Sequence, residues 1–270
     1  MSNEPIVIRM ARPADAASIV GLFASSFAPA VVTAMLYGCP GASEFVRILV
    51  SLPLPLAERL YFVADVADQV VGCIELRRVT SGLFLSYIAT APEYRRQGLA
   101  RRLLAKGIGA SDADYGTTFS LDVFADNAAA ERWYRDLGLT TQGESDWWRL
   151  PVEHATAGAE DAVVHDFPQA EAIHQRFGFS EFRVATEQGP VRVGRLGDQW
   201  FRLTDPGCLA NSALHSVLRR LDPRREIVAI LPTGALPASL QRAARLMVRS
   251  CRMECSLRIV ARHLGLDAEG

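Results

Sequence analysis

Residues 83–104, LFLSYIATAPEYRRQGLARRLL, predict a strand, a turn and a helix in direct succession. The run Leu83–Ala89 is apolar and β-branched, which is typical of a buried strand. Pro92 ends this run, because proline has no backbone N–H for a strand ladder. Apolar residues then recur with helical spacing, so a helix is expected to begin near Gly98.

The start of this helix has the features of an anion-binding site. The first turn of a helix leaves several backbone N–H groups without partners, at the positive end of the macrodipole. Gly98 and Ala100 would let two phosphate groups approach the main chain, while Arg95, Arg96 and Arg101 would add positive charge at the rim. We therefore expect the turn to bind a pyrophosphate. An arginine-rich helix start that only faces solvent is the alternative.

Two motifs resemble the GNAT acyltransferase superfamily. RRQGLA at residues 95–100 resembles the family's Gln/Arg-x-x-Gly-x-Gly/Ala signature. NAAAERWYRDLGL at residues 127–139 resembles its Asn-x-x-Ala-x-x-x-Tyr-x-x-x-Gly-Phe block, with Leu139 in place of the common Phe. IRMARPAD at residues 8–15 resembles the family's first strand and helix entrance. The resemblance covers roughly residues 4–150, which we expect to form an acyl-CoA-binding catalytic domain.

The sequence pattern of this region predicts an α/β fold with a mixed sheet and the order βααβββαβαβ. The expected strands are 6–10, 61–67, 70–79, 83–89, 119–124 and 139–150, and the expected helices begin near Pro13, Ser43, Gly98 and Asn127. The resemblance implies a GNAT-like domain in which the strands 83–89 and 119–124 splay apart. A cofactor would enter that gap, because an unpaired strand edge can bind an extended, amide-containing chain.

A polar, Ala/Gly-rich linker is expected at 151–162, and a second domain at 163–270. Its expected strands are 182–187, 191–196, 199–203, 226–231 and 250–259, and its expected helices are 212–221 and 237–248, with a further helix within 165–179. The order suggests a second, smaller α+β lobe that is GNAT-like but degenerate, without its first strand and first helices apart from the one within 165–179. Asp205 stands where the first lobe has arginines and would repel a phosphate. A separate small partner-binding domain is the alternative.

The resemblance implies that the protein is an acetyl-CoA-dependent N-acetyltransferase that moves the acyl group directly to an amine of a small molecule or a protein. The residues expected to bind acetyl-CoA are Tyr87, Ile88, Ala89 and Thr90 on the strand, Arg95, Arg96, Gln97, Gly98, Leu99, Ala100 and Arg101 at the turn, and Asn127 and Tyr134 on the later helix. A backbone N–H near Ile88 or Ala89 would polarise the thioester carbonyl.

Three side chains are candidates for proton transfer. Tyr134 holds the family's proton-donor position and would protonate the departing thiolate; an aromatic core residue is the alternative. Glu75 is the first candidate for the base, and an ordinary Glu75–Arg77 ion pair is the competing interpretation. Asp122 is the second candidate, with a hydrogen bond to a backbone group as its alternative.

Composition agrees with a globular enzyme and excludes other classes of protein. The chain has 49% hydrophobic and 22% charged residues and a net charge of −1, and no long basic face that would bind nucleic acid. No apolar run is long enough for a membrane span, and the N-terminus lacks the pattern of a signal peptide, so we expect a cytoplasmic protein. The five cysteines are expected to be free thiols and no metal site is expected, because Cys251 and Cys255 lack further ligands nearby.

Two other functions remain open from the sequence. A catalytically silent acyl-CoA sensor would bind the cofactor without releasing thiol. A tandem interaction scaffold would have kept the fold and lost the ligand.

Overall fold

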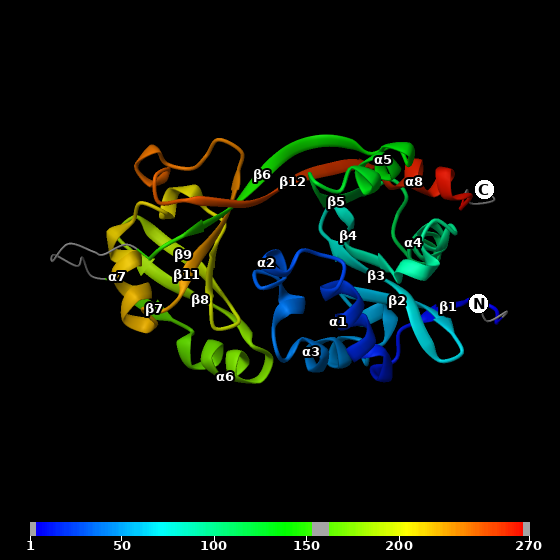
Figure 1. Ribbon diagram of the computed structural model, residues 1–270, viewed down its shortest axis with the longest axis horizontal. Coiled ribbons are helices and arrows are strands. Elements are labelled where there is room, and N and C mark those ends of the chain that lie inside the picture. The colour runs from blue at the N-terminus through cyan, green and yellow to red at the C-terminus, as the bar shows by residue number, and fades with distance from the viewer. Residues whose placement is uncertain (1–3, 153–161, 267–270) are drawn as a thin grey trace. The chain divides into compact units, whose positions relative to one another are not determined.

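The computed structural model describes residues 4–152 and 162–266 (Figure 1). The chain divides into two compact units, each discontinuous in sequence. The first unit comprises Met1–Phe27, Ser43–Gly143 and Cys251–Gly270, and the second comprises Ala28–Ala42 and Glu144–Ser250. The division thus differs from the contiguous segments 4–150 and 163–270 expected from the sequence. Most of the linker expected at 151–162 lies outside the described residues.

The order βααβββαβαβ is confirmed in the first part of the chain except for one additional short helix, α2 (Pro29–Val32), between the two helices expected after the first strand. Its elements are β1 (Val7–Met10), α1 (Ala16–Ala24), α2 (Pro29–Val32), α3 (Ala42–Leu49), β2 (Arg59–Val66), β3 (Gln69–Val79), β4 (Gly82–Thr90), α4 (Leu99–Gly109), β5 (Thr118–Phe124), α5 (Ala128–Asp136) and β6 (Thr140–Leu150). Ala67 and Asp68, both with positive φ, form the two-residue turn between β2 and β3.

The sheet of the first unit has the strand order β1-β2-β3-β4-β5-β12-β6, where β12 (Arg245–Ser256) is the last strand of the chain. β4 and β5 are parallel, whereas β1 to β4 are antiparallel. α4 packs on β2 and β3, and α1 packs on β3 and β4 (Figure 1). Alternation along the strands sends Leu76 and Leu83 into the core beneath α4, and turns Glu75 and Tyr87 to the other face.

The C-terminal segment completes the first unit. The N–H of Leu257 donates to the carbonyl oxygen of Thr117 at 2.8 Å, and Thr140 Oγ1 donates to the carbonyl oxygen of Glu254 at 3.3 Å. α8 (Leu257–Leu264) packs on α4 and β5. The expectation that 139–150 is the last strand of this lobe is therefore wrong, because β12 lies between β5 and β6.

The second unit confirms a second, smaller lobe of mixed α/β type. Its elements are β7 (Val163–His165), α6 (Phe167–Phe177), β8 (Phe179–Thr186), β9 (Gly189–Leu196), β10 (Trp200–Leu203), α7 (Ser212–Leu221) and β11 (Glu226–Pro232). Its strand order is β6-β11-β10-β9-β8-β7, with β10 and β11 parallel. β7 and α6 supply the first strand and helix, so the expectation that this lobe lacks its first strand is wrong.

The helix expected at 237–248 is also wrong. The chain forms only a 3-10 turn at Ala238–Leu240 and then enters β12 at Arg245. Leu240 is the one buried side chain of 237–248, so the apolar stripe has no core to pack against as a helix. The strand expected at 250–259 ends at Ser256, where α8 begins.

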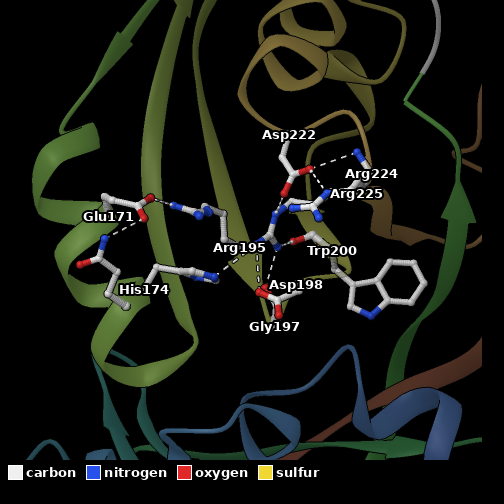
Figure 2. A network of polar contacts seen from close by, with 10 residues as sticks. Glu171, His174, Arg195, Gly197, Asp198, Trp200, Asp222, Arg224 and Arg225 are labelled. Atoms are coloured by element: carbon white, nitrogen blue, oxygen red, sulfur yellow. Dashed lines mark hydrogen bonds and ion pairs between the residues drawn. The ribbon is translucent and has the colours of Figure 1, made fainter.

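A buried guanidinium organises the second unit (Figure 2). The side chain of Arg225 is 3% exposed and donates to the carbonyl oxygens of Gly197 at 2.7 Å and Trp200 at 3.2 Å. It also donates to Asp222 at 3.2 Å and to Nε2 of His174 at 3.2 Å. Burial and the nearby arginines lower the pKa of His174 from 6.5 to about 4, which keeps this imidazole neutral.

Candidate active site

The parallel strands β4 and β5 separate before either strand ends. They pair only over Gly82–Leu85 and Thr118–Leu121, although β4 continues to Thr90 and β5 to Phe124. The splay expected from the resemblance is therefore confirmed. Beyond Leu85 the edge of β4 has no strand partner on the β5 side.

A β-bulge lies where the gap opens. Leu76 pairs with Leu85 and Glu75 pairs with Tyr87, so Ser86 has no residue opposite it in β3. Bulges bend a strand and redirect its groups, and they are frequent beside active sites. The bulge therefore changes the direction of the β4 backbone at the closed end of the gap.

The pairing of β3 with β4 shows which backbone groups face the gap. The N–H of Ala91 donates to the carbonyl oxygen of Val71 at 2.8 Å, and the register continues without a break back to Tyr87. Because groups alternate along an antiparallel ladder, Tyr87 and Ala89 bond to β3, whereas Ile88 and Thr90 turn their N–H and C=O groups away from it. Of the two oxyanion donors expected from the sequence, Ile88 thus has the suitable orientation.

The predicted anion site lies at the start of α4. Gly98 is the N-cap, with φ of 73°, and no side chain caps the helix there. A Cβ added at Gly98 would meet nothing within 4 Å. Leu99 is buried and anchors the helix to the core, while Ala100 is half-buried. The first-turn N–H groups are therefore open to an anion.

The basic side chains around this turn have different partners. Arg96 is exposed, has a positive φ and makes no hydrogen bond with a described residue. Arg95 donates through Nε to the carbonyl oxygen of Thr90 at 3.3 Å, and Gln97 donates to the carbonyl oxygen of Glu93 at 2.9 Å. Arg101 bonds instead to the carbonyl oxygen of His263 in α8. Arg95 and Arg96 are thus the two arginines left at the rim of the turn.

The matching helix of the second unit has a filled N-terminus. Asn211 is the N-cap of α7, and its side chain accepts from the N–H of Leu214 at 2.9 Å. Asp205 accepts from the N–H of Gly207 at 2.8 Å. Side chains already occupy the donors that an anion would use, which agrees with the expectation that this lobe has lost its phosphate site.

Asn127 and Tyr134 lie on the helix that follows β5. Asn127 caps α5 by accepting from the N–H of Ala130 at 3.2 Å, at the helix start expected from the sequence. Tyr134 is 6% exposed, packs beside Trp133 and belongs to the core beneath α4. Burial raises the pKa of Tyr134, so the phenol keeps its proton. Its hydroxyl group makes no hydrogen bond with a described residue and is free to donate to a ligand.

Aromatic side chains line the gap on the face of the sheet opposite α4. Phe27 contacts Tyr87 of β4 at 6.0 Å and Phe124 of β5 at 5.6 Å between ring centroids, so its ring bridges the two separated strands. Phe23 of α1 contacts Tyr87 at 5.3 Å. The sequence assigns Phe23 and Phe27 only to a helix core face, and nothing in their spacing indicates this second role.

The structure places both candidate bases in ion pairs. Glu75 is fully buried and accepts from Arg59 at 2.9 Å, and no Glu75–Arg77 ion pair forms. Asp122 is half-exposed and accepts two hydrogen bonds from Arg252, so the backbone partner considered from the sequence is replaced by a guanidinium. Arg252 lies in β12, which sequence spacing could not place beside β5. No group of three metal-ligand side chains occurs in residues 4–152 and 162–266.

Comparison with known families identifies this architecture. The model of the acetyltransferase (GNAT) family matches residues 42–139, which hold both separated strands, the turn and α5. Residues 42–139 match the GNAT family. No curated protein matches the chain. None of the helices in the described residues is long and apolar enough to cross a membrane.

Solved structures with the same fold cover nearly the whole chain, and not only the residues that the family model matches. A tandem GNAT protein of the clavulanic acid biosynthesis pathway has 13% identity and a TM-score of 0.63, over 94% of this chain and 99% of that one. A GCN5-related N-acetyltransferase from Sphaerobacter thermophilus has 14% identity and a TM-score of 0.61, over 94% and 96%. A protein from Pyrococcus horikoshii described as an acetyltransferase has 18% identity and a TM-score of 0.60, over 96% and 92%. These similarities establish the fold of two GNAT-like lobes.

Proposed function

We propose that the protein is an N-acetyltransferase that uses acetyl-CoA and acts on an amine. One observation carries the proposal: the gap between β4 and β5 leads directly to the uncapped start of α4. An extended arm that ends in a pyrophosphate, as in acetyl-CoA, fits this gap and the helix start that follows it. A side chain occupies the N-terminus of α7, as expected for a helix that no longer binds an anion. No side chain caps the N-terminus of α4.

In this proposal the chain holds acetyl-CoA mainly through its backbone. The C=O group of Ile88 and the N–H and C=O groups of Thr90, which turn away from β3, bond the pantetheine amides. The N–H groups of the first turn of α4 bind the pyrophosphate, with Arg95 and Arg96 beside it. The open space at Gly98 fits such a ligand, because a side chain there would lie over the turn.

The proposed reaction joins the amine nitrogen to the acetyl carbon and breaks the carbon–sulfur bond. The N–H of Ile88 polarises the carbonyl group. Tyr134, which keeps its proton because burial raises its pKa, gives that proton to the departing sulfur. Of the two candidate bases, Asp122 is in contact with solvent and Glu75 is enclosed, so a proton from the amine reaches solvent more directly through Asp122.

Turnover with a panel of amines tests the function. The protein is incubated with acetyl-CoA and each amine, free thiol is followed with time, and the acetylated amine is identified by mass spectrometry. Amine-dependent thiol release supports the proposal. Binding of acetyl-CoA without thiol release for any amine would identify a silent sensor, and absence of binding would identify a scaffold.

We also propose that the protein works in the cytoplasm. None of the five cysteines forms a disulfide and four of them are buried, which fits a reducing compartment. Localisation of a fluorescent fusion in cells tests this proposal.

A further inference from the structure

Two neighbouring arginines of β3, Arg77 and Arg78, differ in their hydrogen bonding. Arg78 donates to the carbonyl oxygens of Leu54 at 2.8 Å and Ser111 at 3.0 Å. Arg77 makes no hydrogen bond and no ion pair with any described residue, and its Nε is shielded from solvent without an acceptor. A buried donor without a partner destabilises the folded state, so such a group calls for an explanation.

The charges on this face of the sheet leave Arg77 without compensation. The carboxylate of Glu75 is bonded to Arg59 at 2.9 Å. The carboxylate of Asp122 is bonded to Arg252 at 2.6 Å. Arg77 and Arg252 both lie over the ring of Phe84, at 5.2 and 5.1 Å from its centre. Arg252 also interacts with the charge of Glu254. Of these three guanidinium groups, Arg77 is the one without a carboxylate partner among the described residues.

Arg77 lies at the closed end of the gap. It pairs with Phe84, one position before Leu85, where the contact between β4 and β5 ends. Phe84 is two residues from Ser86 of the bulge, which is about 7 Å along a strand. A donor that enters from the α4 end places its acyl group toward this closed end, so an acceptor that meets the acyl group comes within reach of Arg77.

We propose that Arg77 binds a carboxylate of the acceptor, which makes the acceptor an amine that also carries a carboxylate. This inference rests on the proposed function, because the proposed donor position defines the acceptor end of the gap. A carboxylate matches the positive charge of Arg77 and accepts the hydrogen bond that Nε lacks.

A paired set of acceptors tests the inference. The acceptors are 3-aminopropanoate, 4-aminobutanoate and 6-aminohexanoate, each compared with the n-alkylamine of the same carbon number. The proteins are wild type, Arg77→Met, Arg77→Lys and Arg47→Met, the last being a control on the exposed surface of α3. kcat/KM is measured for each pair, and thermal melting with each compound but without acetyl-CoA gives a readout of binding that needs no turnover.

We expect wild type and Arg47→Met to prefer at least one amino acid over its alkylamine by roughly 10- to 100-fold in kcat/KM, mainly through KM. Arg77→Met should lose the preference for the amino acid and keep its activity on the alkylamine. Arg77→Lys should keep part of the preference. Turnover without a preference in wild type, or with the same preference in Arg77→Met, would overturn the inference and leave the function intact. If no amine is acetylated, melting decides: stabilisation by an amino acid that Arg77→Met lacks supports the carboxylate site, and equal curves reject it.

Discussion

Arg252 and Asp122 are 130 residues apart in sequence and form a two-pronged ion pair. Nε and Nη2 of Arg252 donate to the two carboxylate oxygens at 2.6 and 2.9 Å. The pair joins the last strand of the chain to β5, the strand that forms one side of the proposed acetyl-CoA gap. The first unit is thus complete only with the segment that begins at Cys251.

Removal of the C-terminal segment should therefore unfold the first unit. A chain that ends at Ser250 loses the buried side chains of Met253, Leu257 and Val260. Each such side chain contributes about 1.5–3 kcal/mol, against a typical total stability of 5–15 kcal/mol. Circular dichroism melting should show loss of the cooperative transition, whereas a chain that ends at Leu266 should melt like wild type. A normal transition in the shorter chain would contradict the observed strand order.

The buried Glu75–Arg59 ion pair predicts a stability effect. Glu75→Leu leaves a guanidinium without its partner, so urea unfolding should show a loss of about 3–5 kcal/mol. Glu75→Leu combined with Arg59→Met should recover most of that loss, because the unpaired charge is removed. A double variant as unstable as the single one would show that Glu75 stabilises the fold by other contacts.

The neutral His174 predicts a pH dependence of stability. Its pKa is about 4 in the folded protein and about 6.5 when unfolded, so the unfolded state binds the extra proton between these values. Its contribution to stability is complete above about pH 6.5 and is lost as the pH falls toward 4. Melting temperatures from pH 8 to pH 4 should fall less steeply for His174→Gln, which cannot take up that proton. Parallel curves would show that other groups cause the acid sensitivity.

Tyr134→Phe separates binding from catalysis. The substitution removes only the hydroxyl group of a buried side chain, so the fold and the affinity for acetyl-CoA should stay close to those of wild type. Loss of the proton donor should lower kcat by about 10²- to 10⁴-fold. Tyr115→Phe, at a half-buried tyrosine packed against the same core, is the control and should keep its activity. Unchanged kcat in Tyr134→Phe would restrict Tyr134 to a packing role.

Local sequence signals predicted the parts of the site that one segment builds by itself. The turn at Gly98, the cap at Asn127 and the strand before them follow from glycine, proline and apolar spacing within a few residues. These features also carried the family resemblance. The helix boundaries of α7 were predicted for the same reason, because an apolar stripe there packs against a core.

Features that depend on distant segments could not be predicted. β6 and β12 have similar patterns, and nothing in either one tells which of them lies beside β5. The ion pair considered for Glu75 from the sequence was with Arg77, two residues away, but its partner lies on the neighbouring strand at Arg59. The bulge at Ser86 leaves no mark in the sequence, since it depends on the register between β3 and β4.

The most direct test of the proposed site is thermal melting with and without acetyl-CoA for wild type, Ala100→Glu and Ala105→Glu. Both substitutions add one negative charge to a half-buried alanine of α4, but only Ala100 lies in the first turn. At 100 times its dissociation constant, acetyl-CoA should stabilise wild type and Ala105→Glu by about 2.7 kcal/mol, and Ala100→Glu should show no shift. An equal shift in all three proteins would place the cofactor elsewhere, and the absence of a shift in wild type would contradict acetyl-CoA binding at this turn.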